Sequence, residues 1–486
     1  MKRKGQVQGV GHCRVRATAQ LPRLPEPPNP LSLRGTRVLV IGLGRSGRAV
    51  ARFLLRSRAR VVGFDENPEA LASPAASSLK RAGMKVTRQP QAATVEWAVV
   101  SPGISDKHAL VQALRRRSIP VVDELDLASR FVRGPIIAIT GTNGKSTTTA
   151  LIARMLEGFG KSVFCGGNLA PGQPLSAALL ARPKDYYVVE VSSFQLERAR
   201  WLKPKVAVIL NITADHLNRH GTVRRYANCK LTVLDRQDQE DYAVLNHDDP
   251  LVYAARVRGG AEKHFFSMRH RDVDAYLADG SIWADGHKVQ PAREVKLPGA
   301  HNIQNSLAAI AAVRLLGVGL PPIRRTLRTF AGLPHRMEHV RRLHGVDYFN
   351  SSMTTNPAAG AKSLEAVAGQ RERLSSGGKR ARRVILIAGG REKALPTAEY
   401  VRAMKRHATW VLLVGESSMR LARELSALGF RRFDVLADLP AALVAARAKA
   451  QAGDVVLFAP GFASFDQFRD FEARGEAFRK EVQRLD

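Results

Sequence analysis

The most constraining feature of this sequence is a glycine-rich loop between an apolar run and a helical stretch. Residues 140–147 read TGTNGKST, directly after the apolar run Ile136–Ile139 and before a predicted helix over Thr149–Phe159. A strand, a glycine loop, a lysine and a hydroxyl residue at a helix start form a cradle for phosphate groups. The generic pattern has a first glycine where this chain has Ile139. We therefore interpret residues 140–147 as a variant nucleotide-phosphate loop.

The rest of the chain repeats the alternation that surrounds this loop. From Thr36 onward, short β-branched runs alternate with amphipathic stretches of helical period, which is typical of parallel α/β units. Three βα blocks emerge from this pattern. The candidate strands are Arg37–Ile41, Arg60–Phe64, Val95–Val100, Pro135–Thr140, Tyr186–Val191, Val206–Leu210, Val384–Ile387, Trp410–Val414 and Val455–Phe458.

The block boundaries are expected near Ser129–Gly134 and near Ala331–His335. They divide the chain into domains over residues 35–130, 131–331 and 332–486, after an extension over residues 1–34. The extension is basic, contains the proline-rich run LPRLPEPP and lacks the apolar core of a secretory signal, so we expect it to be flexible. Residues 370–383 (QRERLSSGGKRARR) predict a polar loop before a strand of the third block.

Composition narrows the class of protein. Hydrophobic residues make up 45% of the chain and charged residues 24%, which excludes wholesale disorder, a collagen-like chain and a disulfide scaffold. No apolar run approaches the ~20 residues of a membrane helix, so we expect no membrane span. The cysteines Cys13, Cys165 and Cys229 have neither CxxC spacing nor an even count, which favours a reducing cytoplasm.

The chain is strongly basic. It has 76 Lys and Arg residues against 43 Asp and Glu residues, a formal net charge of +33. Such a charge attracts nucleic acid, anionic lipid or phosphorylated substrates, the first two without a specific site. The simpler interpretation is a heavy use of arginine on solvated faces.

A second glycine loop follows the first predicted strand. Residues 42–47 read GLGRSG and open a predicted helix, and Asp65 ends the next strand. The glycines would let backbone N–H groups approach a diphosphate, and the acid can accept hydrogen bonds from ribose hydroxyls. The pattern is compatible with NAD(P), FAD, a UDP-sugar or a purely structural turn. Ser101–Ile104 follows another buried strand, where ligands of α/β proteins bind.

Polar residues also end two apolar strands that follow the phosphate loop. Glu190 ends the run YYVVE, where a buried carboxylate is costly without a cation or a basic partner. Asp215 and His216 follow another apolar strand in NITADHLNRHG, residues 211–221. Because the carboxyl ends of parallel strands meet at one edge of a sheet, these side chains are predicted to converge. Magnesium would need such oxygen ligands close to the phosphate loop.

The phosphate loop belongs to a series of motifs that run in one order from residue 36 to the C-terminus. The others are GGN (166–168), VEVSSFQLE (189–197), NITADHLNRHG (211–221), YANCK (226–230), LPGAHNIQN (297–305), GLPHRME (332–338) and PGFASFDQF (460–468). In their order and number they resemble the Mur ligase family, and most closely its D-glutamate-adding members.

The resemblance implies an α/β enzyme of three domains: a Rossmann-like N-terminal UDP-binding domain, a central P-loop ATPase domain with a mostly parallel sheet, and a Rossmann-like C-terminal domain. It implies an ATP-dependent ligase of peptidoglycan precursor synthesis, in which D-glutamate is added to UDP-N-acetylmuramoyl-L-alanine through an acyl phosphate. Phosphorylation gives a carboxylate the leaving group that it lacks. The enzyme would act as a cytoplasmic monomer on small-molecule substrates, with no specific nucleic-acid partner.

The resemblance also implies roles for single residues. Catalysis would rest on Lys145, Glu190, His216 and Lys230. Ser146 and Glu190 would hold one Mg²⁺, and His216 with a carbamylated Lys230 a second, because carbamylation turns a repelling cation into a carboxylate. The implied ATP-binding residues are Gly141, Thr142, Asn143, Gly144, Lys145, Ser146, Thr147, Asn302, Asn305 and Arg336. Those for the UDP-linked substrate are Gly44, Arg45, Ser46, Asp65, Ser101 and Asn168, and those for glutamate are Thr355, Lys393, Ser464 and Phe471.

The chain departs from the family pattern at one important place. Where the family has Asn-Asp-Ser-Lys-Ala-Thr-Asn, residues 350–356 read NSSMTTN, so Ser351 replaces an acid and Met353 a lysine. Loss of both charges is compatible with a deleted ion pair or with a repurposed site, and it bears on the choice of amino acid. Smaller departures are Ala214 for proline and Asn218 for aspartate.

Two other functions remain compatible with the sequence. One is a related ligase that adds L-glutamate or another amino acid, or a folylpolyglutamate-type enzyme, although the GLGRSG loop and Asp65 favour a UDP-linked acceptor over a folate. The other is a polyanion-binding ATPase or a scaffold that has lost catalysis, suggested by the net charge of +33 and by Ser351 and Met353. The sequence has no RNA-binding aromatic motif or zinc-finger spacing to support the latter.

Overall fold

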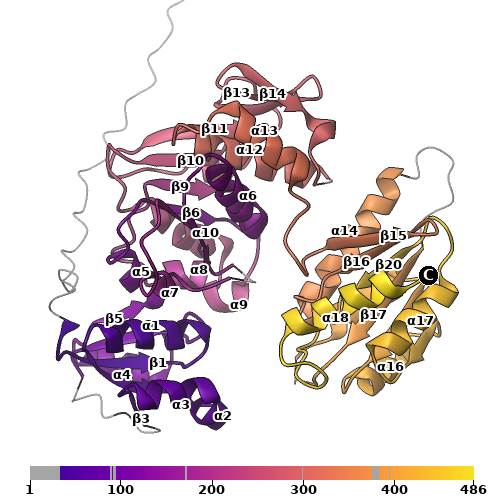
Figure 1. Cartoon of the computed structure of the whole chain (residues 1–486), viewed down its shortest axis with the longest axis horizontal. Helices are drawn as coiled ribbons and strands as arrows, with labels where there is room; N and C mark the ends of the chain where they lie inside the picture. The colour runs from indigo at the N-terminus through magenta and orange to yellow at the C-terminus, as the bar shows by residue number, and fades with distance from the viewer. Residues whose placement is uncertain are drawn as a thin grey trace, which may run out of the picture.

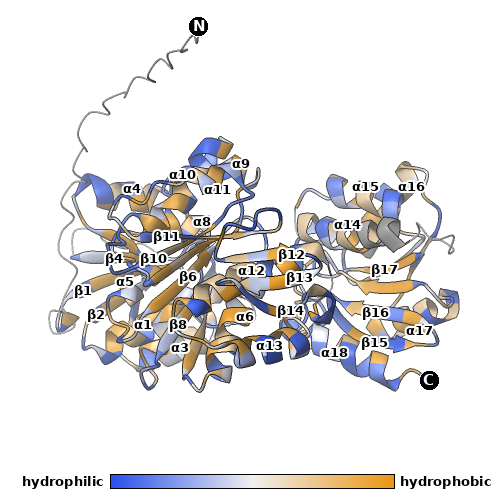
Figure 2. Cartoon of the chain, turned by 90° about the horizontal axis from the view of Figure 1, so that it is seen from above, coloured by the Kyte–Doolittle hydropathy of each residue, from blue (hydrophilic) through white to orange (hydrophobic). Residues whose placement is uncertain are grey.

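The computed structural model describes residues 33–87, 90, 95–169, 172–297, 299–374, 383–392 and 395–486. Within these ranges the chain forms three successive α/β domains, each built on its own sheet (Figure 1). The apolar segments are concentrated in the strands and on the inner faces of the helices, as Figure 2 shows. No helix in the described ranges is both long and apolar enough to cross a membrane.

The first domain is a parallel sheet with helices on both faces. Its strand order is β3-β2-β1-β4-β5. Val38 and Val40 pack on one face while Leu39 and Ile41 pack on the other, which explains the unbroken apolar run of a strand buried on both sides. The strands are β1 (Arg37–Ile41), β2 (Arg60–Phe64), β3 (Lys85–Val86), β4 (Trp97–Val100) and β5 (Val121–Asp123), and the helices are α1 (Arg45–Arg56), α2 (Pro68–Ala72), α3 (Pro74–Arg81), α4 (Ala109–Arg116) and α5 (Glu124–Ser129).

The central domain holds a sheet in the order β14-β13-β12-β11-β10-β9-β6-β8-β7. Pairing is parallel from β7 to β12, and the last two pairs are antiparallel. The strands are β6 (Ile136–Thr140), β7 (Val163–Gly167), β8 (Tyr186–Glu190), β9 (Val206–Ile209), β10 (Tyr242–Asn246), β11 (Glu262–Ser267), β12 (Ala275–Ala278), β13 (Ser281–Ala284) and β14 (His287–Pro291).

Two groups of helices cover the two faces of the central sheet. The longer ones pack on one face, with α6 and α12 side chains such as Leu151 and Leu307 against Ile137 and Val208. The shorter ones pack on the other face, where Tyr226 is buried. The first group is α6 (Lys145–Gly158), α12 (Ala300–Arg314) and α13 (Leu320–Thr329). The second face carries α7 (Leu175–Ala178), α8 (Ser193–Leu196), α10 (Val223–Leu231) and α11 (Pro250–Tyr253), and α9 (Leu217–His220) precedes α10.

The third domain has the strand order β15-β16-β20-β17-β18-β19, with β15 antiparallel at the edge. Helices α14 to α16 pack on one face and α17 and α18 on the other. The strands are β15 (Glu338–Leu343), β16 (Val346–Asn350), β17 (Val384–Gly389), β18 (Trp410–Val414), β19 (Phe433–Val435) and β20 (Val455–Phe458), and the helices are α14 (Pro357–Leu374), α15 (Ala398–His407), α16 (Ser418–Ala427), α17 (Leu439–Lys449) and α18 (Phe471–Arg484).

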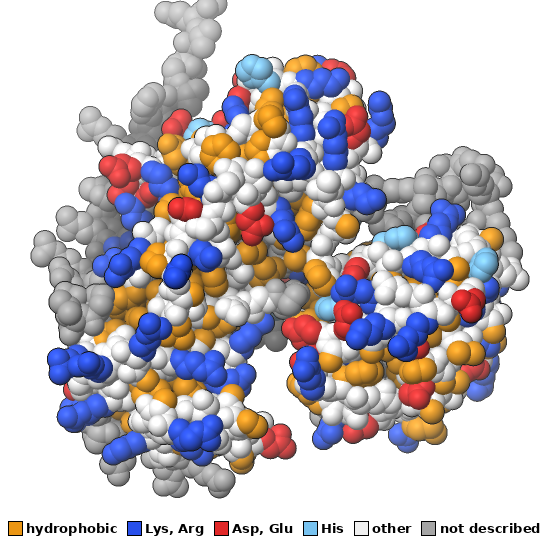
Figure 3. All heavy atoms as spheres, viewed as in Figure 1, with side chains coloured by type: hydrophobic (Ala, Val, Ile, Leu, Met, Phe, Trp, Pro, Cys, Tyr) orange, Lys and Arg blue, Asp and Glu red, His pale blue; other side chains and the backbone are white. Residues whose placement is uncertain are grey.

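The two junctions between domains differ. The first and central domains share an apolar contact, in which the ring centroids of Trp97 and Trp201 lie 5.7 Å apart. Arg198 of the central domain forms an ion pair with Asp106 of the first domain. The third domain follows α13 through one connecting segment, and the space-filling view shows a hollow beside this neck (Figures 1 and 3). A polar contact, Lys362 Nζ to Asp215 Oδ2 at 3.9 Å, bridges the third and central domains.

The predicted fold class is confirmed: the chain is an α/β protein with mostly parallel sheets in three domains. A strand is present at each of the nine predicted places, with ends shifted by two residues at most. The strands β3, β5, β7, β10 to β16 and β19 were not predicted. The exact domain boundaries stay a prediction.

Two local expectations were wrong in detail. The helix after the phosphate loop begins at Lys145 rather than at Thr149, because Gly144 adopts φ +86° and lets the helix start at once. Helix α14 continues to Leu374, so the expected polar loop does not begin at Gln370. Residues 375–382 of that loop, and residues 1–32 of the N-terminal extension, lie outside the described ranges.

Candidate functional site

The phosphate loop leaves the carboxyl end of β6 and enters α6 through two glycines with positive φ. Gly141 has φ +146° and Gly144 has φ +86°. A Cβ atom at Gly144 would overlap the side-chain oxygen of Asn305 on α12. Glycine is therefore required both by the backbone conformation and by the close approach of a second helix.

Lys145 folds back over the loop. Its Nζ donates to the backbone oxygens of Gly141 at 3.0 Å and of Thr142 at 2.8 Å. Burial lowers the pKa of Lys145, Arg336 also lowers it, and the nearby Glu190 carboxylate opposes the shift. A half-buried cation held by carbonyl oxygens at a helix N-terminus is poised to meet an anion.

Glu190, at the end of β8, is buried and lies at the centre of a polar cluster. Its Oε2 accepts a hydrogen bond from Ser146 Oγ, and its Oε1 accepts one from Asn168 Nδ2 at 3.0 Å. Arg336, from the segment between α13 and β15, donates a hydrogen bond to Ser146 Oγ. Burial lowers the pKa of Arg336, with Glu190 opposing. The cluster thus combines a hydroxyl, a carboxylate and a guanidinium beside the phosphate loop.

Asn211, two residues after the end of β9, holds the phosphate loop through both groups of its side-chain amide. Its Oδ1 accepts from Asn143 N at 2.9 Å, and its Nδ2 donates to Asn143 O at 3.1 Å. Asn246, at the end of β10, supports this segment through a 2.7 Å bond to Leu210 O. Asp249 supports it through a 2.7 Å bond from Ile212 N. Two neighbouring strand ends therefore fix the loop in place.

His216 and Lys230 meet around the ring of Tyr226. Lys230 Nζ lies 4.7 Å from the ring centroid, and the His216 ring lies 6.3 Å from it. The Tyr226 hydroxyl is 3.3 Å from Thr142 Oγ1, which ties this group to the phosphate loop. His216 adopts φ +52°, a conformation that is uncommon for a residue with a side chain and that concentrates at functional sites.

Lys230 is the most perturbed cation of this region. Its side chain is buried, and the described residues offer its ammonium no ion-pair partner or hydrogen bond. Burial first, and then the neighbouring Lys145, lower the pKa of Lys230 to about 7. Burial also lowers the pKa of His216, and Asp215 opposes that shift. Lys230 is therefore partly neutral at neutral pH.

The two asparagines of α12 lie on one helix face, as their spacing predicts. Asn305 Nδ2 donates to Asn302 Oδ1 at 3.2 Å, and Asn305 lies against Gly144. The pair therefore stands next to the phosphate loop, at the position where a nucleotide base could be reached from bound phosphates.

The first-domain loop is held by its own polar network. Asp65 accepts from Leu43 N at 2.6 Å and from Asn67 N at 2.9 Å. Ser101 Oγ donates to Gly42 O at 2.9 Å. Arg45, exposed at the start of α1, donates to Gly172 O of the central domain at 2.9 Å. Gly44 and Ser46 flank Arg45 in the chain, so these three predicted residues lie beside the central domain.

The predicted glutamate residues are less clearly assembled. Ser464 is buried, Thr355 is half-buried, and Phe471 begins α18 with its backbone oxygen accepting a 2.8 Å bond from Ser352 Oγ. Among the described residues, no hydrogen bond joins Thr355, Ser464 or Phe471 to the phosphate loop. Lys393 and the side chain of Asn218 lie outside the described part of the chain.

Ser351 and Met353, which depart from the family pattern, make neutral contacts in the structure. Ser351 Oγ lies 3.1 Å from Ser363 Oγ on α14, so a neutral hydroxyl pair occupies this buried position. Met353 is half-buried, and its backbone N–H donates to His335 O at 3.1 Å. Arg474 holds the turn through bonds to Ser352 Oγ at 3.1 Å and Ser352 O at 2.9 Å.

Three residues at the site were not among the predicted site residues. Asn211 and Tyr226 stood in recognised motifs, so their position at a strand end and one helical turn before Lys230 was the available signal. Lys362 on α14 had no local signal, because its ion pair with Asp215 links segments far apart in the sequence.

The fold and the geometry define the class of this protein: an α/β chain with a phosphate loop at the carboxyl edge of its central sheet. Three family models match it: the Mur ligase MurD-like N-terminal domain at residues 36–123, the Mur ligase middle domain at 139–313, and the Mur ligase glutamate ligase domain at 335–462. The chain belongs to the Mur ligase family.

Curated relatives match over almost the whole length. A UDP-N-acetylmuramoylalanine–D-glutamate ligase of Pelotomaculum thermopropionicum is 40% identical over 92% of this chain and 97% of its own. The enzyme of the same name from Caldanaerobacter subterraneus is 36% identical over 94% of this chain and 100% of its own.

Solved structures share the fold. The UDP-N-acetylmuramate-alanine ligase of Thermotoga maritima aligns with a TM-score of 0.56 and 20% identity, covering 92% of this chain and 99% of that chain. A MurF ligase of Thermotoga maritima, solved in complex with ADP, aligns with a TM-score of 0.52 and 19% identity, covering 94% and 97%.

Proposed function

We propose that this chain is an ATP-dependent ligase that adds D-glutamate to UDP-N-acetylmuramoyl-L-alanine through an acyl phosphate, in peptidoglycan precursor synthesis. Relatives of that name, 36–40% identical over nearly the full length, support the substrates. The single structural observation that carries the chemistry is the cluster at the phosphate loop, where Ser146 binds both Glu190 and Arg336 and the Lys145 side chain folds over the same loop. We expect these residues to bind the triphosphate of ATP.

The donors at this cluster suit one Mg²⁺ ion. The Ser146 hydroxyl and the Glu190 carboxylate are hard oxygen ligands within hydrogen-bonding distance of each other. Bound there, Mg²⁺ would neutralise charge on the phosphoryl oxygens. Asn168 would orient Glu190, since it holds the other carboxylate oxygen at 3.0 Å.

A second Mg²⁺ would require a change in Lys230. As an ammonium, Lys230 repels a cation, whereas its carbamate offers carboxylate oxygens beside His216. CO₂ adds to a neutral amine, and the pKa of about 7 makes that form available at neutral pH. The buried, otherwise unpaired side chain supports carbamylation of Lys230, with His216 as the neighbouring ligand.

The residues of the chain then have distinct tasks in the reaction. Lys145 and Arg336 place positive charge beside the phosphates while an acceptor carboxylate oxygen attacks the γ-phosphorus and ADP leaves. The amine of D-glutamate then attacks the carbonyl carbon, and phosphate leaves with the original carboxylate oxygen. Holding amine and carbonyl together supplies much of the acceleration of that second step.

The domains would divide the substrates among them. We assign the UDP-linked acceptor to residues 35–130, with Gly44, Arg45, Ser46, Asp65 and Ser101, joined by Asn168 of the central domain. ATP falls to residues 131–331, with Asn302 and Asn305 at the adenine. The amino acid falls to residues 332–486, with Thr355, Lys393, Ser464 and Phe471. Each single chain carries all of these residues, so a monomer suffices.

We further propose that the enzyme works in the cytoplasm. Among the described residues both Cys165 and Cys229 are free, and burial raises the pKa of each thiol to about 12. Such thiols are inert and fit a reducing compartment.

The proposal is tested by amino-acid-dependent ADP release with the purified full chain, Mg-ATP and UDP-N-acetylmuramoyl-L-alanine. We expect ADP only when D-glutamate is added, and little with L-glutamate or D-aspartate. ADP release with a different amino acid would instead identify a sibling ligase. ATP turnover that is stimulated by nucleic acid and indifferent to the UDP-linked acceptor would contradict the proposal.

A further inference from the structure

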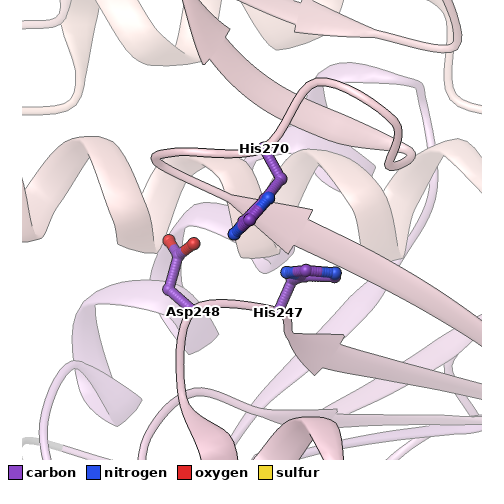
Figure 4. A group of neighbouring side chains, drawn as sticks. All are labelled: His247, Asp248 and His270. Atoms are coloured by element: carbon purple, nitrogen blue, oxygen red, sulfur yellow. The ribbon is translucent and has the colours of Figure 1, made fainter.

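A second group of ligand-type side chains lies at the carboxyl ends of β10 and β11, and the proposed reaction does not use it. His247 and Asp248 directly follow β10, and His270 follows β11 (Figure 4). One ligand atom of each of the three residues lies within 4.8 Å of the others. Two imidazoles and one carboxylate in such a group are a typical donor set for a transition metal.

A hydrogen-bond network already orients the carboxylate of this group. Asp248 Oδ1 accepts from Ser267 Oγ at 2.6 Å, and its Oδ2 accepts from Met268 N at 2.7 Å. Each carboxylate oxygen keeps a further lone pair for a metal. Hydrogen-bond partners of this kind orient the ligating carboxylates of metal sites.

Ser267 also fixes the turn that carries His270. Its Oγ accepts backbone hydrogen bonds from Arg269 N at 2.9 Å and from His270 N at 2.7 Å. One buried serine therefore sets the positions of a ligand from each strand end. Because Ser267 is fully buried, this arrangement does not depend on an exposed loop alone.

His247 has an unused ring nitrogen. Its Nδ1 is buried and has no hydrogen-bond partner among the described residues. The ring packs against Tyr253 at 4.6 Å and Phe265 at 5.8 Å between ring centroids, and lies 4.2 Å from the His270 ring. The aromatic neighbours fix the imidazole without using its donor or acceptor capacity, so a bound ion could use it.

We propose that His247, Asp248 and His270 bind a divalent first-row transition metal, Zn²⁺ foremost, with the fourth position open to water or to an outside ligand. Imidazole ligands select such a metal over Mg²⁺, which takes oxygen ligands. The donor atoms of a tetrahedral zinc site lie about 3.3 Å apart. The exposed His270 side chain would rotate to bring its ring nitrogen that close.

The local charge permits this ion. Asp248 supplies one negative charge. Of the two arginines that flank His270, Arg271 is paired with Asp279 at 2.9 Å and Arg269 is exposed to solvent. The site shares no ligand with the proposed magnesium site at Ser146 and Glu190. Both nevertheless lie along the same edge of the central sheet, because Asn246, which precedes His247, binds the segment that supports the phosphate loop.

The test is metal binding by the full chain in excess Mg²⁺, which saturates sites of oxygen ligands. Zn²⁺ binding is measured by calorimetry, and Co²⁺ binding by its visible absorption, which reports nitrogen coordination. His270→Ala is the main variant, since an exposed side chain can be removed without disturbing the core. We expect it to bind one equivalent fewer than the natural chain, with a loss of the Co²⁺ bands and an unchanged melting temperature.

Two further variants keep the test sharp. Ser267→Ala removes the hydroxyl that orients Asp248, so we expect Zn²⁺ affinity to fall by about 10- to 100-fold. His287→Ala is the matched control, because His287 is an exposed histidine of the same domain whose hydrogen bond, within the described part of the chain, is to Asp285 O of its own turn at 2.8 Å. It should bind as the natural chain does.

The proposal is overturned if the natural chain and His270→Ala bind the same number of equivalents. That result would place any bound metal elsewhere, for example at His12 and Cys13 or at His216. It is equally overturned if no Zn²⁺ binds more tightly than about 100 μM at neutral pH. Neither result bears on ADP release, so the proposed ligase function is judged separately.

Discussion

The two glycine loops of this chain share a backbone design and differ in the buried charge beside them. Each loop leaves the carboxyl end of a parallel strand and opens a helix, α1 in the first domain and α6 in the central one. Near the first loop the buried groups are acids: burial raises the pKa of Glu124 to about 7. Near the second, cations accompany the buried Glu190: burial lowers the pKa of Lys145 and brings that of Lys230 to about 7.

A glycine loop alone therefore does not define the chemistry of the site that it forms. The first loop is tied by Asp65 and Ser101, which leaves exposed Arg45 as its cation toward a ligand. The second loop collects positive charge from three separate segments, through Lys145, Lys230 and Arg336. Burying a cation such as Lys230 costs stability, and that cost makes sense where a polyphosphate supplies the opposite charge.

The largest expected effect separates the two loops. Lys145→Ala should lower kcat by about 10³-fold or more and leave the fold intact, because the side chain places charge at the phosphates and contacts only loop carbonyls. Initial rates of ADP release measure this. Lys161→Ala, which removes an exposed lysine just after α6, should be neutral. Normal turnover by Lys145→Ala would remove the distinction between the loops.

Replacing Lys230 should lower activity nearly as much as replacing Lys145, and this loss should be partly reversible. Lys230→Ala should lower kcat by about 10²- to 10³-fold. Acetate or propionate should restore part of the activity by replacing the carbamate oxygens. Absence of any rescue, with the folded variant confirmed by its melting curve, would count against a carbamate.

The pH dependence of the natural enzyme also tests whether Lys230 carries a carbamate. CO₂ adds to the neutral amine, and the neutral fraction of Lys230 falls as pH drops below its pKa of about 7. Activity in bicarbonate buffer should therefore decrease below about pH 7. The acetate-rescued variant should lack that decrease, since it has no amine to titrate.

Local patterns were enough to predict the parts of the site that lie within single segments. The loop at 140–147 and the polar ends of β8 and β9 follow from strand period and glycine placement. The pairing of Arg336 with Ser146 and of Lys362 with Asp215 did not, because these contacts join residues far apart in the sequence. The neutral Ser351–Ser363 pair was likewise invisible, since only folding brings α14 against that turn.

The strands, too, could be predicted only where their own sequence pattern is strong. Strands buried on both faces, such as β1, were recognised as unbroken apolar runs. The strands β12 to β14 at the edge of the central sheet mix polar and apolar residues and are four or five residues long. Their pairing depends on neighbours rather than on a strong period of their own.

The first loop predicts a smaller effect, on binding rather than on chemistry. Arg45→Ala should raise KM for the UDP-linked acceptor by about 10-fold with kcat nearly unchanged, as expected for loss of one charge-assisted hydrogen bond. Steady-state kinetics at saturating ATP measure it. Arg52→Ala, an exposed arginine on the same helix, is the control. A fall in kcat without a change in KM would erase the contrast with Lys145.

The smallest effect concerns stability near the first loop. Glu124 accepts a 2.6 Å bond from Ser176 N, and burial raises the pKa of its carboxyl from 4.5 to about 7. Between those pH values the native state binds more protons than the unfolded state, so the free energy of unfolding falls as pH rises. Glu124→Gln should therefore stabilise the protein above pH 7 by about 1–3 kcal/mol, and little at pH 4.5.

Thermal unfolding at both pH values tests this, with the exposed Glu399→Gln as a control that should change neither curve. Equal stabilisation at both pH values would show that Glu124 is not the titrating group.

The central claim is that the cations and carboxylate around the phosphate loop make an acid group attackable by phosphorylating it. It is tested most directly by following oxygen-18 from the terminal carboxylate of the UDP-linked acceptor during turnover with ATP and D-glutamate. An acyl phosphate transfers one labelled oxygen to inorganic phosphate for each amide bond formed. Inorganic phosphate that carries no label while product accumulates would contradict the account.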